Sequence, residues 1–376
     1  MRVLSKSMHG SRPRIGIAGQ LPPPLGGQNL AIAALWKDLQ ARADIDSVFC
    51  PFQFTPTTGQ VRRATWRKAW ELLKVRNRLV QIKKEGGLDV LLFPVGGPQT
   101  IPLIRDLFLV PWARAACRYF AIQFHAAGLA EEMKNRPSWL AKRVARLLGK
   151  ADVAFIMAEA NRADPEVCGI SDIRVRPHQI PDQTTPLTLS KKRNGILYVG
   201  HLGDEKGTPG LIQAMATVPP ELSLTLVGDP LPPWSLEKFR DLAKQYGVSE
   251  RVNIMGSRAP EELGAFYSSA ALFVFPSVAP YESFGLVLAE AMMWGLPIVA
   301  SDWKANREVV GPGENFIFTP GRTENLSQAI VKAAKGRERW PIIGSQNRQR
   351  YVSQHKLGTN LTLVEDLIRI AKSCHI

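Results

Sequence analysis

The chain has 376 residues, of which 45% are hydrophobic and 22% are charged. This length accommodates about two domains that each bury a core of their own, and this composition excludes a disordered or fibrous protein. A transmembrane helix is not expected either, because the longest uncharged stretch, residues 15–36, is interrupted by three prolines and a glycine pair.

The first residues and the cysteines indicate the compartment. Residues 1–14 carry several basic side chains and contain no apolar segment of the kind found in signal peptides. The four cysteines are scattered, with no C-x-x-C pair and no histidine at metal-binding spacing, so we expect reduced, buried thiols. These features favour a cytoplasmic protein.

The net charge of +15 lies mostly in the first half of the chain. Residues 1–190 hold 27 Lys and Arg against 15 Asp and Glu, whereas residues 191–376 hold 21 against 18. An excess of this kind indicates an anionic partner. Anionic lipid, a phosphorylated acceptor and nucleic acid are all candidates.

In the first half, short apolar runs predict buried strands at 14–19, 88–94, 119–125 and 151–159. The glycine pair at 26 and 27 opens a helix after the first strand. A glycine there lets the backbone approach a phosphate or sugar closely, although glycine pairs more often serve turns. Residues 101–117 predict a helix that is broken near Pro111.

Two basic helices are predicted in the same half. The helix at 61–85 carries nine Lys and Arg, with Trp66 and Trp70 among them. The helix at 135–149 is also basic, and we place Trp139 on its apolar side. One interpretation is an ordinary amphipathic helix, whose basic residues face water and whose apolar residues face the core. The other is a surface that lies at lipid headgroups, and the sequence leaves both open.

The second half restarts an alternating pattern after a polar, proline-containing stretch at 181–195 that is typical of a linker. Strands are predicted at 195–200, 223–229, 252–256, 271–275, 296–301 and 314–318, separated by helices that include 234–246 and 260–269. Residues 359–373 predict a terminal helix. Alternation of this kind predicts a parallel, doubly wound sheet.

The stretch from Ala271 to Asp302 places a strand, a loop, a helix and a second strand in direct succession. The helix begins near Leu286, and its N–H groups and positive dipole end point to the carboxyl end of the preceding strand, which makes an anion seat. Glu282 lies just before the helix and Glu290 lies inside it, in the pattern E-x7-E. A sugar nucleotide needs an acceptor for sugar hydroxyls, donors for a diphosphate and an acceptor for ribose hydroxyls, in that order.

Residues 282–300, ESFGLVLAEAMMWGLPIVA, resemble the signature of family 4 glycosyltransferases with the GT-B fold, roughly E-x-F-G-x4-E-A-M-x-x-G-x-P-V-V-A. Residues 198–207, YVGHLGDEKG, resemble a second family motif, Y-V-G-R-L-x-x-E-K-G. His201 stands where the family has an arginine. The resemblance is strong over 196–312 and weak over 14–130.

The resemblance implies an α/β GT-B fold, in which two Rossmann-like, doubly wound domains face each other across a cleft. We place an acceptor-binding domain at 1–182, a nucleotide-sugar-binding domain at 195–356, and at 357–376 a terminal helix that in this family crosses back to the first domain.

The resemblance also implies roles for individual residues. Glu282 and His125 would contact the transferred sugar, and Lys206 would neutralise the diphosphate of the leaving group. The remaining donor contacts would be Gly27, His201, Ser283, Phe284, Gly285, Leu286 and, at the ribose, Glu290. Asn306 and Glu308 would close over the donor. No catalytic base can be assigned.

These roles describe a retaining, metal-independent hexosyltransferase that moves a sugar from a nucleotide sugar to a saccharide or lipid-linked acceptor in cell-surface polysaccharide or glycolipid biosynthesis. No cofactor is expected beyond the donor, and no metal, because no D-x-D follows a strand. A peripheral position on the inner face of the cell membrane fits the basic helices. A non-catalytic sugar-nucleotide-binding protein is the first alternative, and a basic nucleic-acid-binding protein is a weaker one, since no nucleic-acid reader module is recognisable and no nucleic acid is expected.

Overall fold

The structure is a computed structural model that describes residues 12–22, 27–52, 66–135, 139–185, 193–358 and 362–375. Its contacts divide the chain into two compact units. Unit 1 contains the described residues within 1–156, 162–176 and 361–376, and unit 2 contains those within 157–161 and 177–360. Each unit is therefore built from segments that lie far apart in the sequence.

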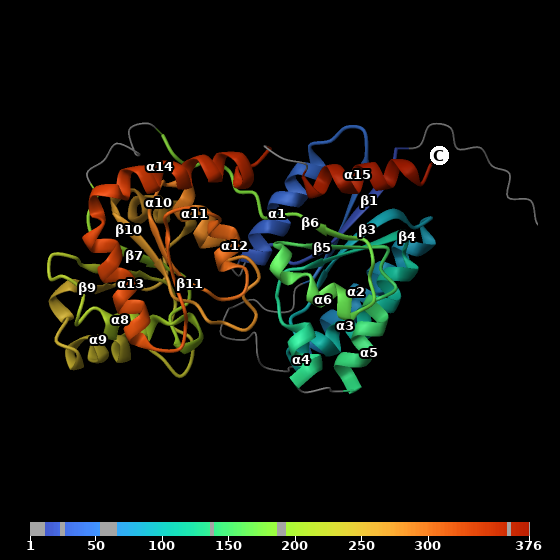
Figure 1. Cartoon of the computed structure of the whole chain (residues 1–376). Coiled ribbons are helices and arrows are strands. Elements are labelled where there is room, and N and C mark those ends of the chain that lie inside the picture. The colour runs from blue at the N-terminus through green and yellow to red at the C-terminus, as the bar shows by residue number, and fades with distance from the viewer. Residues whose placement is uncertain are drawn as a thin grey trace, which may run out of the picture. The chain divides into compact units, whose positions relative to one another are not determined.

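Unit 1 is organised around a six-stranded parallel sheet (Figure 1). The strands are β1 (Arg14–Gly19), β2 (Asp46–Pro51), β3 (Leu88–Val95), β4 (Cys117–Phe124), β5 (Val153–Ile156) and β6 (Ile173–Val175). They lie in the order β2-β1-β3-β4-β5-β6. All eight residues of β3, LDVLLFPV, are buried, as expected of a central strand that is covered on both faces.

Helices cover both faces of this sheet. The helices are α1 (Gly27–Gln40), α2 (Trp66–Lys84), α3 (Thr100–Ala115), α4 (Leu129–Asn135), α5 (Trp139–Leu148), α6 (Ala163–Val167) and α15 (Leu363–Ser373). Apolar side chains of α2, α3 and α5 share one core. Those of α1 and α15 share a second core, so the two groups of helices lie on opposite faces of the sheet.

The terminal helix α15 is fixed to unit 1 by ion pairs as well as by apolar packing. Asp366 is 1% exposed, and its two oxygens accept from Arg174 Nη1 at 3.3 Å and from Arg176 Nε at 2.5 Å. A buried carboxylate of this kind needs both partners, because an unpaired charge in the interior is strongly destabilising.

Unit 2 contains a second six-stranded parallel sheet. Its strands are β7 (Ile196–Val199), β8 (Leu224–Val227), β9 (Val252–Ile254), β10 (Leu272–Phe275), β11 (Ile298–Ser301) and β12 (Phe316–Phe318). The order is β12-β11-β10-β7-β8-β9, so the chain runs outward in one direction from β7 and then in the other from β10. The point between β7 and β10 is a topological switch point, where open α/β sheets bind ligands.

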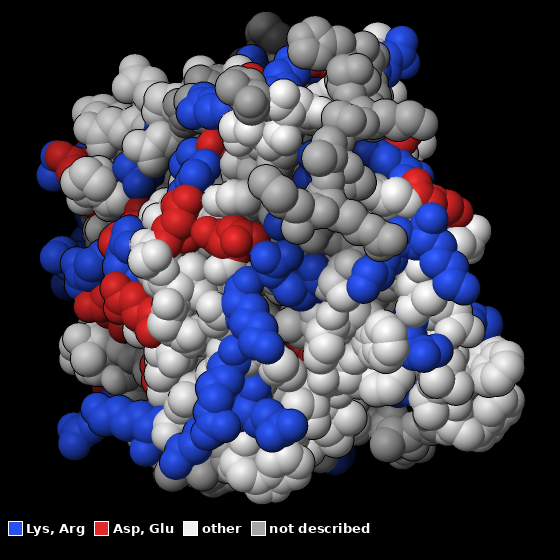
Figure 2. Space-filling model, turned by 90° about the vertical axis from the view of Figure 1, so that its right-hand side faces the viewer, with Lys and Arg blue, Asp and Glu red and all other residues white. Residues whose placement is uncertain are grey.

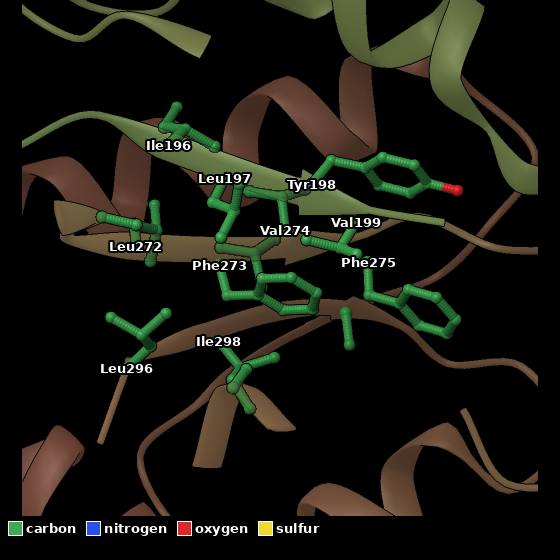
Figure 3. Packing of buried hydrophobic residues seen from close by; sticks show 14 of the residues in the cluster. Ile196, Leu197, Tyr198, Val199, Leu272, Phe273, Val274, Phe275, Leu296 and Ile298 are labelled. Carbon is green, nitrogen blue, oxygen red and sulfur yellow. The ribbon is translucent and has the colours of Figure 1, made fainter. Parts of the chain in front are cut away.

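The helices of unit 2 are α8 (Thr208–Ala214), α9 (Leu236–Gln245), α10 (Pro260–Ser269), α11 (Leu286–Met293), α12 (Asn306–Val310), α13 (Thr323–Lys335), α14 (Trp340–Arg350) and a π-helical turn at Tyr351–His355. They pack with the strands into one continuous core. Figure 3 shows its centre, where side chains of β7, β10 and β11 interdigitate. Leu197, Phe273 and Ile298 are each 1% exposed or less.

The structure confirms the α/β class and the two parallel, doubly wound sheets that the sequence predicts. It also contains two strands that we did not predict, β2 and β6. The predicted break at Pro111 is wrong, because α3 continues through this residue to Ala115. Burial of Leu109, Val110 and Ala113 on the same helix offsets the hydrogen bond that a proline removes.

The two basic helices differ from prediction in detail. The helix predicted at 61–85 is observed as α2, Trp66–Lys84, and residues 61–65 lie outside the described part of the chain. The placement of Trp139 on the apolar side of its helix is wrong, since its side chain is 71% exposed while Leu140, Val144 and Leu148 face the core. Among the described residues, no helix has the length and apolar character needed to cross a membrane.

Candidate functional site

The candidate site of unit 2 lies at the carboxyl ends of β7 and β10, on either side of the switch point. The loops that follow these strands are joined to each other, because the Val278 amide donates to the Glu205 carbonyl at 2.8 Å. Gly207 has a φ of 68°, and a Cβ at this position would lie 2.4 Å from the Pro276 carbonyl oxygen. Only glycine allows the two loops to approach each other this closely at position 207.

Lys206 and Glu282 come from these two loops and form an ion pair. Lys206 Nζ lies 2.7 Å from Glu282 Oε2, and the side chains are 12% and 13% exposed. Ser277, which is fully buried, donates its hydroxyl to the same carboxylate oxygen at 2.9 Å. Two donors on one oxygen fix the orientation of the carboxylate, and both side chains of the pair remain partly accessible to solvent.

His201 follows β7 in the first of these loops. The hydroxyl of the buried Tyr198 donates to its backbone carbonyl at 2.6 Å, which fixes the backbone at the strand end. Burial and the positive charge of Lys206 lower the pKa of His201. The imidazole is therefore mostly neutral near pH 7, whereas the arginine of the family motif would be charged.

The helix whose N-terminus we expect to form the anion seat, α11, begins where the sequence predicts. Gly285 precedes the helix with a φ of 65°, a left-handed conformation that favours glycine, and Leu286 is the first helical residue. Ser283 is buried, and its carbonyl accepts from Asn161 Nδ2 at 2.7 Å. The first N–H groups of a helix have no partner within it, so they are oriented to bind an anion.

Phe284 anchors the loop before α11 through packing in the interior of unit 2. Its ring is 3% exposed and lies edge-on to two histidines, with centroids 5.4 Å from His178 and 5.5 Å from His355. Burial and the nearby charge of Arg350 lower the pKa of His355 to about 4. Phe284 therefore supports the loop through packing and does not present a polar group to a ligand.

Glu290 lies one turn into α11, and its Oε2 accepts from the hydroxyl of Tyr267 at 2.6 Å. Burial raises the pKa of the Glu290 carboxyl, and the bond from Tyr267 opposes that rise. Tyr267 is 1% exposed and belongs to α10. A carboxylate that is half-buried beside an anion seat is a suitable acceptor for neutral hydroxyl groups.

Two further residues named from the sequence are engaged within unit 2. Asn306 is fully buried and donates its amide to Ser301 Oγ at 3.0 Å. The carboxylate of Glu308 accepts from the backbone amides of Glu159 and Ala160, at 2.7 and 2.9 Å. Both side chains thus hold together segments of the unit.

Next to them, Lys304 has a φ of 50°, a left-handed conformation that is rare for a side chain with a Cβ. This residue lies in the loop after β11, which is joined to the loop after β10 because Trp303 Nε1 donates to the Ala279 carbonyl at 2.8 Å.

The remaining two candidates belong to unit 1. His125 follows β4 directly at its carboxyl end and is half-buried. Gly27 is the first residue of α1, and the glycine before it lies outside the described part of the chain.

Sequence patterns did not indicate Ser277, Tyr267 or Asn161, which orient Glu282, Glu290 and the Ser283 loop. Ser277 could have been found, because it follows β10 by two residues, at the carboxyl end of a central strand, where open α/β sheets bind ligands. The other two act across long sequence separations that a linear motif does not encode.

Residues 179–350 match the family described as Glycosyl transferases group 1. The chain is similar to the D-inositol 3-phosphate glycosyltransferase of Corynebacterium efficiens, with 29% identity over 251 residues, covering 60% of this chain and 57% of that protein. It is also similar to the MMP alpha-(1->4)-mannosyltransferase of Mycolicibacterium hassiacum, with 31% identity over 225 residues, covering 56% of this chain and 51% of that protein. The chain thus spans little more than half the length of these curated relatives.

Solved structures share the fold over nearly the whole chain. The sucrose-phosphate synthase of Thermosynechococcus elongatus has a TM-score of 0.73 at 20% identity and covers 96% of this chain and 97% of its own. Anabaena HepE in complex with UDP and glucose has a TM-score of 0.71 at 21% identity and covers 96% and 100%. At sequence identities this low, the similarity shows a common fold and nothing further. These structures confirm the GT-B fold, and the family match supports the resemblance over residues 179–350.

Proposed function

We propose that this chain, which has the GT-B fold and matches the group 1 glycosyltransferases over residues 179–350, is a retaining glycosyltransferase that uses a nucleotide sugar as its donor. The observation that carries the proposal is the pair of Lys206 and Glu282, held 2.7 Å apart at the switch point beside the N-terminus of α11. A cation and a helix N-terminus suit the negative charge of a diphosphate, and a nearby carboxylate suits the hydroxyl groups of the sugar.

In this proposal each residue has one role. The N–H groups of α11 and Lys206 bind the diphosphate, whose negative charge grows as the glycosidic bond breaks, so a cation in place before the reaction stabilises the transition state. Glu282, released from Lys206, accepts from hydroxyls of the transferred sugar. Glu290 accepts from the ribose. Residues 195–356 would hold the donor and residues 1–182 the acceptor, with His125 and Gly27 assigned by resemblance alone.

The donor and acceptor are proposed from the relatives. HepE is described with UDP and glucose, and the relative from C. efficiens is named for an inositol phosphate. We therefore propose a UDP- or GDP-sugar as the donor and a phosphorylated or lipid-linked acceptor, which suits the excess of positive charge within residues 1–190. As the process we propose cell-surface polysaccharide or glycolipid biosynthesis.

Metal independence is part of the proposal. The chain contains one D-x-D, Asp44 to Asp46, at the start of β2. Asp44 pairs with Lys372 at 2.8 Å and Asp46 with Arg14 at 3.0 Å, so both carboxylates have cationic partners. We expect transfer to proceed at the same rate in the presence of EDTA, and a loss of activity that Mg²⁺ or Mn²⁺ restores would contradict this part.

The decisive experiment separates a transferase from a non-catalytic binder. Melting temperatures measured with UDP-glucose, UDP-galactose, GDP-mannose and no ligand identify the nucleotide that binds. Release of free nucleotide from that donor, measured with and without saccharide and phosphoinositol acceptors, identifies transfer. Binding without acceptor-dependent release would leave a sugar-nucleotide-binding protein. No stabilisation by any donor, together with a mobility shift of DNA or RNA, would favour the nucleic-acid alternative.

Peripheral membrane contact is proposed for unit 1. Trp66 and Trp70 of α2 are 84% and 56% exposed, and Trp139 of α5 is 71% exposed. The sequence of α2 contains seven Lys and Arg against a single Glu, and that of α5 contains three and no acid. Figure 2 shows a band of Lys and Arg side chains running down the face that it presents. Tryptophan beside basic residues suits an anionic headgroup layer, to which each cation contributes on the order of 1 kcal/mol.

Liposome flotation tests this contact. We expect recovery on vesicles that contain phosphatidylglycerol, weaker recovery at higher salt, and loss of recovery in the double variant Lys142→Gln/Arg143→Gln beside Trp139. The matched control is Lys332→Gln/Lys335→Gln on α13 of unit 2, which removes the same charge from another exposed helix. Equal recovery of the two variants, or recovery on neutral vesicles, would contradict membrane contact by α5.

A further inference from the structure

A partly buried hydrogen bond links two helices of unit 2 beside the expected anion seat. The hydroxyl of Tyr267 on α10 donates to Glu290 Oε2 on α11 at 2.6 Å. Tyr267 is 1% exposed, and its ring packs against Phe273 of β10 with centroids 5.8 Å apart. Packing against the core thus fixes the position of the Tyr267 ring, and the fixed ring directs its hydroxyl toward Glu290.

The bond is short, and its acceptor is a carboxylate in partly apolar surroundings. A charged acceptor makes such a bond stronger than one between neutral groups. Burial and the charge of Glu290 raise the pKa of Tyr267 well above its ordinary value, so the phenol stays protonated and remains the donor. The same bond lowers the pKa of Glu290 against the effect of burial, so it favours the ionised carboxylate.

The neighbouring elements bring few other charges to this pair. Tyr198 of β7 contributes to the raised pKa of Tyr267. The pKa of Tyr198 is itself raised by burial and by the nearby Glu282 and Tyr281. The helices α12 and α14 and the π-helical turn also contact α11.

Charged groups on these elements are directed elsewhere. Arg307 pairs with Asp302 at 2.7 Å and Arg348 with Asp182 at 2.6 Å. Arg350 donates to the carbonyls of Glu308 and Val309, which leaves Tyr267, among the residues that the structure describes, as the group bonded to the Glu290 carboxylate.

We infer that Tyr267 is a positioning residue for nucleotide binding, whose hydroxyl holds the Glu290 carboxylate so that its other lone pairs face the ribose hydroxyls of the donor. This inference rests on the proposed function, since it takes Glu290 as the ribose acceptor. A carboxylate that is already oriented loses little rotational freedom when the ribose binds. Tyr267 therefore contributes to affinity without contacting the ligand.

The test measures nucleotide affinity as a function of pH in the full chain. Isothermal titration with UDP-glucose and GDP-mannose is suitable, because their diphosphates do not titrate near neutral pH. For Tyr267→Phe we expect the dissociation constant of the bound donor to rise roughly tenfold at pH 7, because the Glu290 side chain must then be ordered when the donor binds. The decline of affinity on acidification should also move to higher pH, because Glu290 then takes up its proton more readily.

Two variants separate positioning from a merely structural role. Glu290→Ala should remove the pH dependence, and Tyr267→Phe should cost nothing further in that background, because the tyrosine hydroxyl then has no side-chain oxygen to orient. Tyr351→Phe is the matched control, since it removes another buried hydroxyl of unit 2, one that donates to the Ile180 carbonyl at 2.9 Å. We expect its affinity to equal that of the wild type.

Three outcomes would overturn the inference. In the first, Tyr267→Phe binds the donor as the wild type does. In the second, it loses affinity equally at every pH. In the third, it costs the same in the Glu290→Ala background as in the wild type, which would indicate a packing defect. If the wild-type chain binds neither donor, the proposed function fails first, and the inference fails with it.

Discussion

Removal of the Lys206 ammonium group should lower both the free energy of unfolding and the rate of transfer. The structure allows the two effects to be measured separately. Lys206→Met keeps most of the side-chain volume and leaves Glu282 with Ser277 as its remaining donor. The pair is 12% and 13% exposed, between the surface pairs that contribute up to about 1 kcal/mol and the buried pairs whose loss costs about 3–5 kcal/mol. We therefore expect the free energy of unfolding to fall by about 2 kcal/mol.

The assay is urea unfolding, with midpoints compared at equal slope. The double variant Lys206→Met/Glu282→Gln should recover most of the lost stability, because it removes the unpaired carboxylate as well. A matched control is Lys74→Met on α2, where Lys74 lies 2.8 Å from Glu71 but is 57% exposed. That change should alter the unfolding free energy by no more than about 0.5 kcal/mol.

Activity should respond differently from stability. Both Lys206→Met and the double variant should lose on the order of a hundredfold in kcat, with a smaller change in the donor KM, because the cation acts on charge that develops in the transition state. The reasoning would be refuted if Lys206→Met unfolded at the same urea concentration as the wild type, or if the double variant recovered its kcat together with its stability.

Three further changes have expected outcomes. His201→Arg should raise kcat roughly tenfold at pH 7, because burial and Lys206 keep the histidine mostly neutral, and an unchanged kcat would mean that this position does not face the diphosphate. Lys304→Asn should be about 0.5–1 kcal/mol more stable to urea than Lys304→Ala, because asparagine tolerates the φ of 50° better than alanine does, and equal midpoints would contradict backbone strain at this residue. The folded pKa of His355 lies near 4, below its ordinary 6.5, so the unfolded chain binds the proton more readily and stability falls by up to about 3 kcal/mol as the pH drops from 6.5 to 4. His355→Phe should flatten that part of the pH–stability curve, and an unchanged slope would show that another group titrates.

The central strands could be predicted from the sequence, whereas the outer ones could not. Continuous apolar runs such as LFVF of β10 and IVAS of β11 are buried on both faces and leave an unambiguous pattern. The strand β2, DSVFCP, lies at a sheet edge, buries only alternate residues and ends on a proline, and β6 has three half-buried residues. Short edge strands of this kind cannot be distinguished from loops by hydrophobicity.

The candidate site was predictable in part for a similar reason. The helix N-terminus at Leu286 and the glycine before it follow from local rules, and the structure places both where the sequence does. The bond from Tyr267 to Glu290 joins helices α10 and α11 across 23 residues, and the bond from Asn161 to Ser283 spans 122. Such contacts depend on how elements pack, which no residue spacing encodes.

The most direct test of the central claim is a crystal structure of the full chain with a bound nucleotide sugar, either UDP-glucose or GDP-mannose. We predict the diphosphate at the N-terminus of α11 within hydrogen-bond distance of Lys206 Nζ, the ribose hydroxyls on the Glu290 carboxylate, and the sugar beside Glu282. A nucleotide bound elsewhere in unit 2, or bound here with its ribose away from Glu290 and Lys206 still paired to Glu282, would contradict the claim that this site holds the donor.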